Sequence, residues 1–220
     1  MSNTHGIWNQ ISEESKDRLV YMGEIQSVPK GTVLFEEGQR IPELYMVLEG
    51  YIALYRSSRS GGQRIIFICG EGELINESVV SFPEVCTSAK TLSKTVLLTI
   101  DWDLFVRLTE QDASLGTLFV SSLTGKNRRL YHQLGNANGT DPLERRLNAR
   151  LWKLARDYGI DTPDGRQIGF EINVTMLAEM LGAKRESVSR AASVLRKEGL
   201  LLYQDGKMTV TDLNLLRKRI

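Results

Sequence analysis

Residues 175–199 read TMLAEMLGAKRESVSRAASVLRKEG, and this stretch decides how the C-terminal third of the chain folds. Two short segments with apolar residues at helical intervals meet at Gly182. Two helices joined by a tight turn that contains glycine form a helix-turn-helix. The stretch therefore predicts one helix before Gly182 and a second helix that begins near Arg185.

The second of these helices has two chemically distinct faces. At about 100° per residue, its apolar residues gather on one side and its polar residues on the other. The apolar side consists of Val188, Ala191, Ala192 and Leu195, and the polar side consists of Arg185, Glu186, Ser189 and Arg190.

The polar side chains suit the base edges of the DNA major groove. Arginine can bond bidentately to guanine, glutamate can accept from cytosine, and serine is adaptable. Arg196 and Lys197 follow one to two turns later, where phosphates would pass, and Thr175 in the first helix is a further candidate DNA contact. For a helix-turn-helix pattern alone, the competing interpretation is an ordinary amphipathic helix with a solvated face.

Residues 200–211 follow directly and predict a β-hairpin. Two apolar runs, 200–203 and 208–211, flank an Asp205-Gly206 turn, which is the strongest short-range hairpin signal. A recognition helix followed at once by a hairpin is a winged helix, and this order of parts favours DNA binding over a merely solvated face.

The composition is that of an ordinary globular chain. The 220 residues are 41% hydrophobic and 25% charged, which excludes disorder, collagen and a coiled-coil rod. No run approaches the ~18 apolar residues of a membrane span, and the N-terminus lacks a secretory signal pattern, so we expect a cytoplasmic protein without a membrane partner. Residues 1–139 carry 13 Lys and Arg against 16 Asp and Glu, whereas residues 140–220 carry 15 against 11. The positive charge of the second part is a mild sign of a polyanionic partner.

The residues from Val28 to Ile100 predict an all-β barrel or sandwich. Runs rich in β-branched and aromatic residues alternate with turns that contain glycine. Residues 102–109 and 113–134 contain no proline and have helical periodicity, so they predict two helices. In the second, Phe119, Leu123 and Leu130 form an interrupted stripe, which favours packing partly on the barrel and partly on a second copy.

The order of these parts resembles the cyclic-AMP receptor protein and fumarate-nitrate regulator (CRP/FNR) superfamily over essentially the whole chain. The resemblance rests on KGTVLFEEG at 30–38, LYMVLEGYI at 44–52, GEGELINE at 70–77, LAEMLG at 177–182 and RESVSR at 185–190. It implies an α+β fold with an N-terminal double-stranded β-helix (jelly-roll) barrel, a long dimerisation helix and a C-terminal winged helix-turn-helix that recruits or blocks RNA polymerase.

The resemblance also implies a division of the chain and a mode of DNA reading. Residues 1–110 are expected to form an effector-sensing barrel domain, 111–134 the dimerisation helix, 135–140 a hinge and 141–220 the DNA-binding domain. Asp141 before Pro142 signals the start of a helix. In the family, positions matching Arg185, Glu186, Ser189 and Arg190 touch base edges, so we expect a palindrome with TGA-containing half-sites about 34 Å apart, one helical turn of DNA.

Family members that bind cyclic nucleotide use a glycine and a glutamate for the ribose, then an arginine and a serine or threonine for the phosphate. Glu77 matches the glutamate, but Asn76 replaces the glycine, and Val85 and Cys86 stand where the arginine and serine would be. A buried phosphate without its arginine loses a charge-assisted partner, so cyclic AMP is not expected. Lys90 or Arg64 could supply the missing charge, and the matching positions on the long helix are near Lys126, Leu130 and Tyr131. The expected ligand is an unknown small effector that shifts the orientation of the DNA-binding domain about the hinge, or none at all.

Other effector chemistries and other protein classes remain as alternatives. Two cysteines are too few for an iron-sulfur cluster, and both are expected to be plain buried residues. Haem bound by His132 with Cys69 or Cys86, a thiol switch at Cys86, and a regulatory module attached to a partner enzyme are the weaker hypotheses. Two histidines give no recognisable catalytic set, so neither an enzyme, a metal site nor a cofactor is predicted. The segment Asp157–Gly165 is expected to be a surface loop that contacts polymerase or simply connects two elements.

Overall fold

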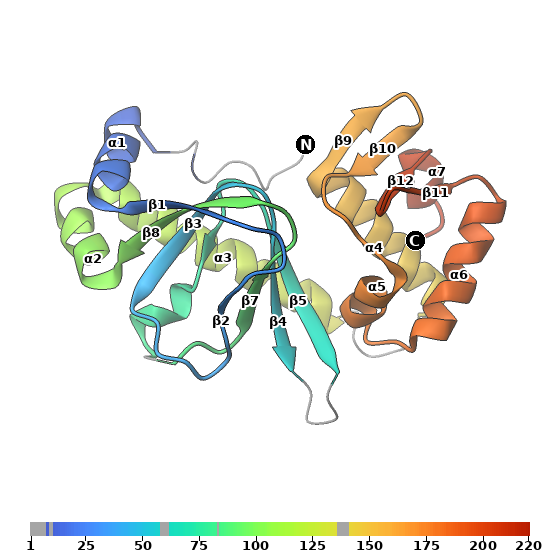
Figure 1. The fold of residues 1–220 in the computed structure, drawn as a ribbon, viewed down its shortest axis with the longest axis horizontal. Helices are drawn as coiled ribbons and strands as arrows, with labels where there is room; N and C mark the ends of the chain where they lie inside the picture. Colours follow the sequence, from blue (N-terminus) through green and yellow to red (C-terminus); the bar gives the residue numbers. More distant parts are fainter. Residues whose placement is uncertain (1–7, 9–10, 58–61, 83, 136–140) are drawn as a thin grey trace. The chain divides into compact units, whose positions relative to one another are not determined.

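The computed structural model describes residue 8 and residues 11–57, 62–82, 84–135 and 141–220. The chain forms two compact units (Figure 1). The barrel unit comprises residues up to Arg56 and Ile66–Gly135, and the C-terminal unit comprises residues 136–220 together with Ser57–Ile65. Within the described residues, no helix combines the length and apolar character needed to cross a membrane.

Two antiparallel four-stranded sheets build the barrel unit, as the β-rich sequence predicts. The first has the order β1-β8-β3-β6 and the second has the order β2-β7-β4-β5. The strands of the first sheet are β1 (Glu24–Val28), β8 (Thr95–Asp101), β3 (Glu43–Glu49) and β6 (Leu74–Ile75). Those of the second are β2 (Val33–Phe35), β7 (Ser88–Thr91), β4 (Ile52–Ser57) and β5 (Gln63–Cys69).

The first sheet is covered on both faces, which explains its continuous apolar runs. In β3, Leu44 and Met46 pack into the cluster formed with the helices, whereas Tyr45 and Val47 pack into the core between the sheets. Successive side chains of a strand point to opposite faces, so all four of these residues are buried.

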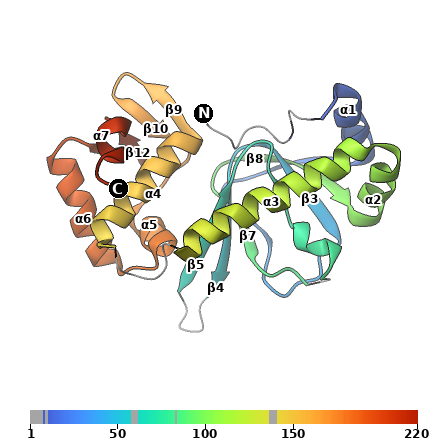
Figure 2. The same ribbon diagram turned by 180° about the vertical axis from the view of Figure 1, so that it is seen from behind.

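Three α-helices cover the outer face of this sheet. They are α1 (Glu13–Met22), α2 (Trp102–Gln111) and α3 (Ala113–Gly135), and a short 3₁₀ turn, η2, spans Glu77–Val80. Figure 2 shows α3 running diagonally across the barrel in front of its strands. The helices expected at 102–109 and 113–134 are confirmed. The sequence interpretation overlooked α1, although Ser12 caps it by accepting a hydrogen bond from the Ser15 amide at 3.1 Å.

Phe119 corrects the expected stripe on α3. Its ring lies 5.3 Å from that of Trp102 and 5.9 Å from that of Phe105, inside the cluster between the helices and the first sheet. Phe119 therefore faces the barrel core and belongs to a different side of α3 from the exposed Leu123 and Leu130.

The C-terminal unit combines four helices with one antiparallel sheet. The helices are α4 (Leu143–Tyr158), α5 (Val174–Leu181), α6 (Arg185–Lys197) and α7 (Leu213–Arg217). The sheet has the order β11-β12-β10-β9, formed by β11 (Leu201–Gln204), β12 (Lys207–Val210), β10 (Gly165–Ile168) and β9 (Gly159–Thr162). Two guanidinium groups contact the ring of Trp152 in α4, with Arg156 at 4.6 Å and Arg217 of α7 at 5.7 Å from its ring centre.

Two local expectations for this unit are wrong in detail. Residues 157–165 are not a loop, because α4 continues to Tyr158 and the β9–β10 hairpin follows at once. Its turn residues mark this hairpin, whose strands extend the wing sheet. The cap of α4 is Pro142 and not Asp141, which instead pairs with Arg145 one helical turn later. The expected hinge at 135–140 begins with the last residue of α3, and its remainder lies outside the described residues.

Candidate nucleic-acid interface and effector site

The turn between α5 and α6 depends on Gly182. This residue adopts the left-handed conformation at φ 58°, and the amide of Ala183 then bonds the carbonyl of Ala178 at 3.1 Å. Glycine reaches this backbone region without a Cβ penalty. At the other end of α5, Asn173 accepts a hydrogen bond from the amide of Met176 at 2.9 Å. A capped helix and a glycine turn thus fix where α6 begins.

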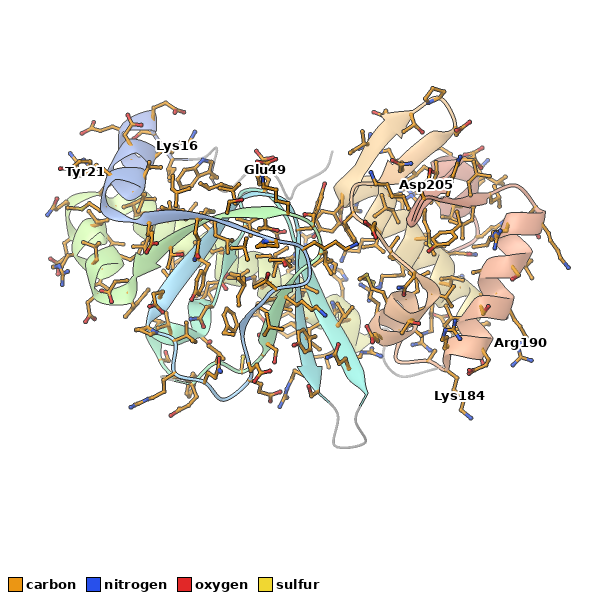
Figure 3. All side chains as sticks on the ribbon, in the orientation of Figure 1. Lys16, Tyr21, Glu49, Lys184, Arg190 and Asp205 are labelled. Carbon is orange, nitrogen blue, oxygen red and sulfur yellow. The ribbon has the colours of Figure 1, made fainter. Side chains whose placement is uncertain are left out.

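One face of α6 is buried as the periodicity predicts. Val188 is 0% and Leu195 is 4% exposed, and Ala191 and Ala192 are also buried. The residues predicted to read bases are all on the exposed face: Arg185, Glu186, Ser189 and Arg190. Figure 3 shows Arg190 and Lys184 extending away from α6. The apolar side anchors the helix, so its polar side is presented from a rigid support.

The predicted phosphate contacts border a groove between α6 and β11. The groove has a volume of about 560 Å³ and is lined by Arg196, Lys197 and Ser193 of α6 and by Leu201, Leu202, Tyr203 and Gln204 of β11. Thr175 is exposed on α5. The sequence interpretation did not include Tyr203, Gln204 or the exposed Lys184 among the candidates, although Lys184 directly precedes the recognition pattern.

The wing is a tight hairpin, as predicted. Asp205 and Gly206 both have positive φ, 50° and 76°, which is the requirement of a type I′ turn. Figure 3 labels Asp205, which lies in this turn. Tyr203 pairs with Met208 and Gln204 with Lys207 across the two strands. The Asp-Gly pair therefore sets the register of the wing that follows α6.

In the barrel unit, Asn76 directly precedes Glu77 and has a left-handed backbone conformation. Its φ is 69°, a left-handed value that asparagine tolerates better than most residues. Its side-chain amide donates to the carbonyls of Ile41 at 3.1 Å and Glu43 at 2.7 Å. These two hydrogen bonds hold Asn76 in the turn that leads into Glu77.

Glu77 is paired within the chain. One carboxylate oxygen accepts from the hydroxyl of Ser122 at 2.5 Å, and the other forms an ion pair with the ammonium of Lys126. The same ammonium donates to the carbonyl of Leu74 at 2.7 Å. Glu77, Ser122 and Lys126 are all buried. We call these three residues the Glu77 cluster. In this cluster, Ser122 and Lys126 of α3 bind the carboxylate of Glu77, the residue that matches the ribose-binding glutamate of the resembled family.

A second ion pair joins α3 to the barrel. The guanidinium of Arg129 lies 2.8 Å from a carboxylate oxygen of Glu73 and 4.8 Å from the ring centre of Phe67. One turn further, Gln133 donates to the carbonyl of Ile66 at 3.0 Å. The sequence interpretation missed Ser122, Glu73 and Arg129. Steps of four, three and four from Ser122 through Lys126 and Arg129 to Gln133 were the available signal for one polar helix face.

The remaining predicted effector residues do not join the Glu77 cluster. Val85 is buried in the core between the sheets, whereas Leu130 and Tyr131 are exposed on α3. Lys90 is exposed next to Ala89, which faces the core, so alternation along β7 directs Lys90 outward. Arg64 is also exposed, on β5. Both cations are exposed, whereas the Glu77 cluster is buried.

The two cysteines have opposite environments. Cys69 lies in the barrel core, where burial raises the pKa of its thiol to about 12. Cys86 is exposed, so the expectation that both are buried is wrong, because Val85 takes the buried position of that segment. His132 is exposed on α3, and a haem held by His132 and Cys69 would require the thiol to leave the core. No cluster of three metal-ligating side chains occurs among the described residues.

Comparisons with known proteins agree with this architecture. The cyclic nucleotide-binding domain family matches residues 25–112, and the Crp-like helix-turn-helix domain family matches residues 145–219. The chain is 26% identical over 215 residues to the "Anaerobic regulatory protein" of Bacillus subtilis, covering 96% of this chain and 89% of that protein. It is 22% identical to the "CRP-like cAMP-activated global transcriptional regulator" of Mycobacterium tuberculosis, covering 97% and 96%.

A solved structure has the same fold. The c-di-GMP responsive global regulator CLP of Xanthomonas campestris superposes with a TM-score of 0.77 at 17% identity, covering 91% of this chain and all of that one. The matched domains and relatives are those of transcriptional regulators and not of enzymes. On these grounds the chain belongs to the CRP/FNR superfamily of DNA-binding transcriptional regulators.

Proposed function

We propose that the chain acts as a homodimer that reads a palindrome with TGA-containing half-sites through α6. The observation that carries this proposal is the orientation of α6, whose apolar side is buried while Arg185, Glu186, Ser189 and Arg190 are exposed. Arg196, Lys197 and Thr175 add contacts to the DNA backbone. The wing follows directly and lies beside the groove that holds Arg196 and Lys197.

The experiment that tests this reading is Arg190→Ala. Loss of one bidentate base contact is expected to weaken binding to an inverted TGA repeat by about 1–3 kcal/mol, roughly 5- to 150-fold, while binding to a scrambled duplex changes little. Fluorescence anisotropy at fixed salt concentration measures both affinities. Arg107→Ala removes the same side chain from an exposed position on α2 and serves as the control. Equal binding of repeat and scrambled duplexes by the wild-type protein contradicts the proposal.

The dimer is proposed to form through the exposed side of α3. Val120, Leu123, Leu130 and Leu134 are between 38% and 65% exposed on this helix. Figure 2 shows α3 in front of the strands of the barrel unit. An exposed, largely apolar face on a long helix is typical of a helix-pairing surface.

Cyclic AMP is not the proposed effector. The carboxylate of Glu77 is already engaged by Ser122 and Lys126, and Val85 supplies no charge for a cyclic phosphate. The relatives' names include an anaerobic regulator and a cAMP-activated one, so they do not converge on a single signal. Control by a different small effector remains the proposal. A thermal-shift screen of small acids, nucleotides, haem and aromatic compounds tests it, since a ligand that binds the native state raises the melting temperature.

RNA polymerase is the proposed protein partner, and the β9–β10 hairpin is the proposed contact. Ile160 of β9 is 55% exposed, and Asp161 pairs with Arg166 across the hairpin. Ile160→Ala is expected to leave DNA affinity unchanged and to alter transcription from a promoter that carries the repeat. An unchanged transcript level, with the promoter occupied, would assign the hairpin a purely structural role.

A further inference from the structure

The exposed side of α3 carries a heptad pattern that includes one polar residue. Its members are separated by alternating steps of four and three residues: Gly116, Val120, Leu123, Asn127, Leu130 and Leu134. Steps of this kind keep side chains on one seam of a helix. Gly116 is half-buried, and the other members of the seam are exposed: Val120, Leu123, Asn127, Leu130 and Leu134.

A different side of α3 is already used by the barrel. Ser122, Lys126, Arg129 and Gln133 make hydrogen bonds or ion pairs with β5, β6 and the residues beside them. Leu115 and Phe119 continue that side into the apolar core. The helix therefore has one side fixed to the barrel and another side that is available over more than two heptads.

The order of residue types along the seam is informative. A step of three leads from an a position to a d position, so Val120, Asn127 and Leu134 are at a, and Leu123 and Leu130 are at d. Among parallel coiled coils, a β-branched residue at a with leucine at d favours two strands, and a single asparagine at a specifies register and oligomeric state at a cost in stability. The seam matches this pattern at Val120, Asn127 and both leucines.

We infer that Asn127 fixes the parallel, in-register pairing of α3 with α3 of a second copy; this inference rests on the proposed dimer. In a parallel pair, the two Asn127 side chains face each other, and an amide can both donate and accept. In an antiparallel pair, a positions lie opposite d positions, so each amide would be buried against leucine without a partner. An unsatisfied buried polar group is costly, and this cost selects the parallel arrangement.

The orientation matters for DNA binding because each DNA-binding domain follows the C-terminal end of α3. The 23 residues of α3 span about 34 Å at 1.5 Å per residue. Parallel helices begin both DNA-binding domains at the same end of the pair. Antiparallel helices would begin them at opposite ends and would separate the two copies of α6 that one palindrome requires.

Disulfide trapping in a Cys86→Ser background tests the inference. Chains with Val120→Cys are mixed with chains with Leu130→Cys, re-equilibrated and oxidised. A parallel dimer gives only disulfides between identical positions, whereas an antiparallel dimer joins position 120 to position 130. A second mixture, Leu123→Cys with Leu134→Cys, detects the other antiparallel register. Mass spectrometry of the cross-linked peptides identifies the products.

With Asn127 present, disulfides between identical positions are expected to be the products in both mixtures. With Asn127→Val, mixed disulfides are expected to rise to about half of the cross-linked product in one mixture if both orientations become equal in energy, together with larger oligomers. Asn127→Gln keeps an amide and is expected to behave as the wild type. Asn214→Val removes the same group from an exposed position in α7 and is the matched control.

The outcomes separate this inference from the proposed dimer. If Asn127→Val still gives only disulfides between identical positions, Asn127 does not set the orientation, although the dimer stands. If the wild-type chain sediments as a monomer and forms no disulfide at any of the four positions, the dimer itself is refuted. Asn127 is exposed on the protomer, so its replacement leaves the barrel core untouched, and Asn127→Ala provides the same reading should the valine variant not fold.

Discussion

At the residue scale, Lys126 joins two parts of the barrel unit that are far apart in sequence. Its ammonium contacts the carboxylate of Glu77 and the carbonyl of Leu74, and its side chain is only 11% exposed. A charge so deeply placed is tolerated because hydrogen-bond and ion-pair partners surround it. The Glu77 carboxylate in turn has Lys126 and Ser122 as its partners.

Replacing Lys126 by methionine is therefore expected to leave Glu77 with a buried, unpaired charge. The expected loss is about 3–5 kcal/mol in the free energy of unfolding, measured by urea denaturation at one fixed protein concentration. The double variant Lys126→Met with Glu77→Leu removes both charges and is expected to recover most of that loss. A single variant within about 1 kcal/mol of the wild type would show that the pair contributes little to stability.

The two thiols are expected to react at very different rates. Burial raises the pKa of the Cys69 thiol to about 12, so its reactive thiolate is scarce at neutral pH, and its sulfur is inaccessible. Cys86 is exposed. A thiol reagent should label one cysteine promptly in the native protein and the second only after unfolding. Cys86→Ser should abolish the prompt phase, and a prompt phase that survives this change would mean that the barrel opens readily.

At the element scale, α3 packs one side on the barrel and leaves another side exposed, and the exposed side is the proposed dimer surface. Its sequence alone shows a broken stripe, because Phe119 belongs to the barrel side and Leu123 to the exposed side. The periodicity therefore predicted the existence and length of the helix but merged two stripes into one. Separating them required knowledge of which residues the strands of the first sheet cover.

A charge placed in the exposed seam is expected to dissociate the dimer without unfolding the barrel. Leu130→Glu should raise the dimer dissociation constant by at least about 100-fold, equivalent to ~2.7 kcal/mol, because the carboxylates of two copies would meet in an apolar interface. Sedimentation velocity over a range of concentrations measures the change. His132→Glu, at an exposed position of the same helix away from the seam, is the control. Equal dissociation of both variants would place the interface elsewhere.

At the same scale, the winged helix was the most predictable part of the chain. Gly182 and the Asp205-Gly206 turn could be predicted from local sequence alone, because few residue types adopt positive φ. The polar cluster around Glu77 was less predictable. Its members come from η2 and α3, 45 residues apart for Glu77 and Ser122, and only the folded barrel brings them together. Cys86 and Lys90 were assigned from position in the sequence, which does not reveal the side to which a side chain points.

At the scale of the whole molecule, a symmetric dimer requires its two half-sites to have a fixed separation. Two copies of α6 held by one α3 pair can enter successive major grooves about 34 Å apart only when both half-sites lie on the same side of the duplex. Inserting about five base pairs between the half-sites rotates one by half a turn. Affinity for this duplex is expected to fall to that for a single half-site, as measured by anisotropy.

A duplex with about ten inserted base pairs returns both half-sites to the same side of the DNA but increases the distance between them. This duplex therefore distinguishes an effect of half-site orientation from an effect of half-site distance. If separate chains bind the half-sites independently, the affinity should instead be the same for the original duplex and for the duplexes with about five and about ten inserted base pairs. The charge distribution agrees with a DNA partner at this scale, since residues 140–220 carry the excess of Lys and Arg. That excess is expected to make binding weaker as salt concentration rises.

The location of Trp152 in α4, where its ring contacts Arg156 and Arg217, has a practical consequence for studies of the intact chain. The other two tryptophans, Trp8 and Trp102, pack against the apolar cluster of the barrel unit. Phenylalanine at both of those positions would leave a single indole emitter, located in the DNA-binding domain. Its fluorescence would follow that domain alone during melting or duplex titration, with no extrinsic dye attached.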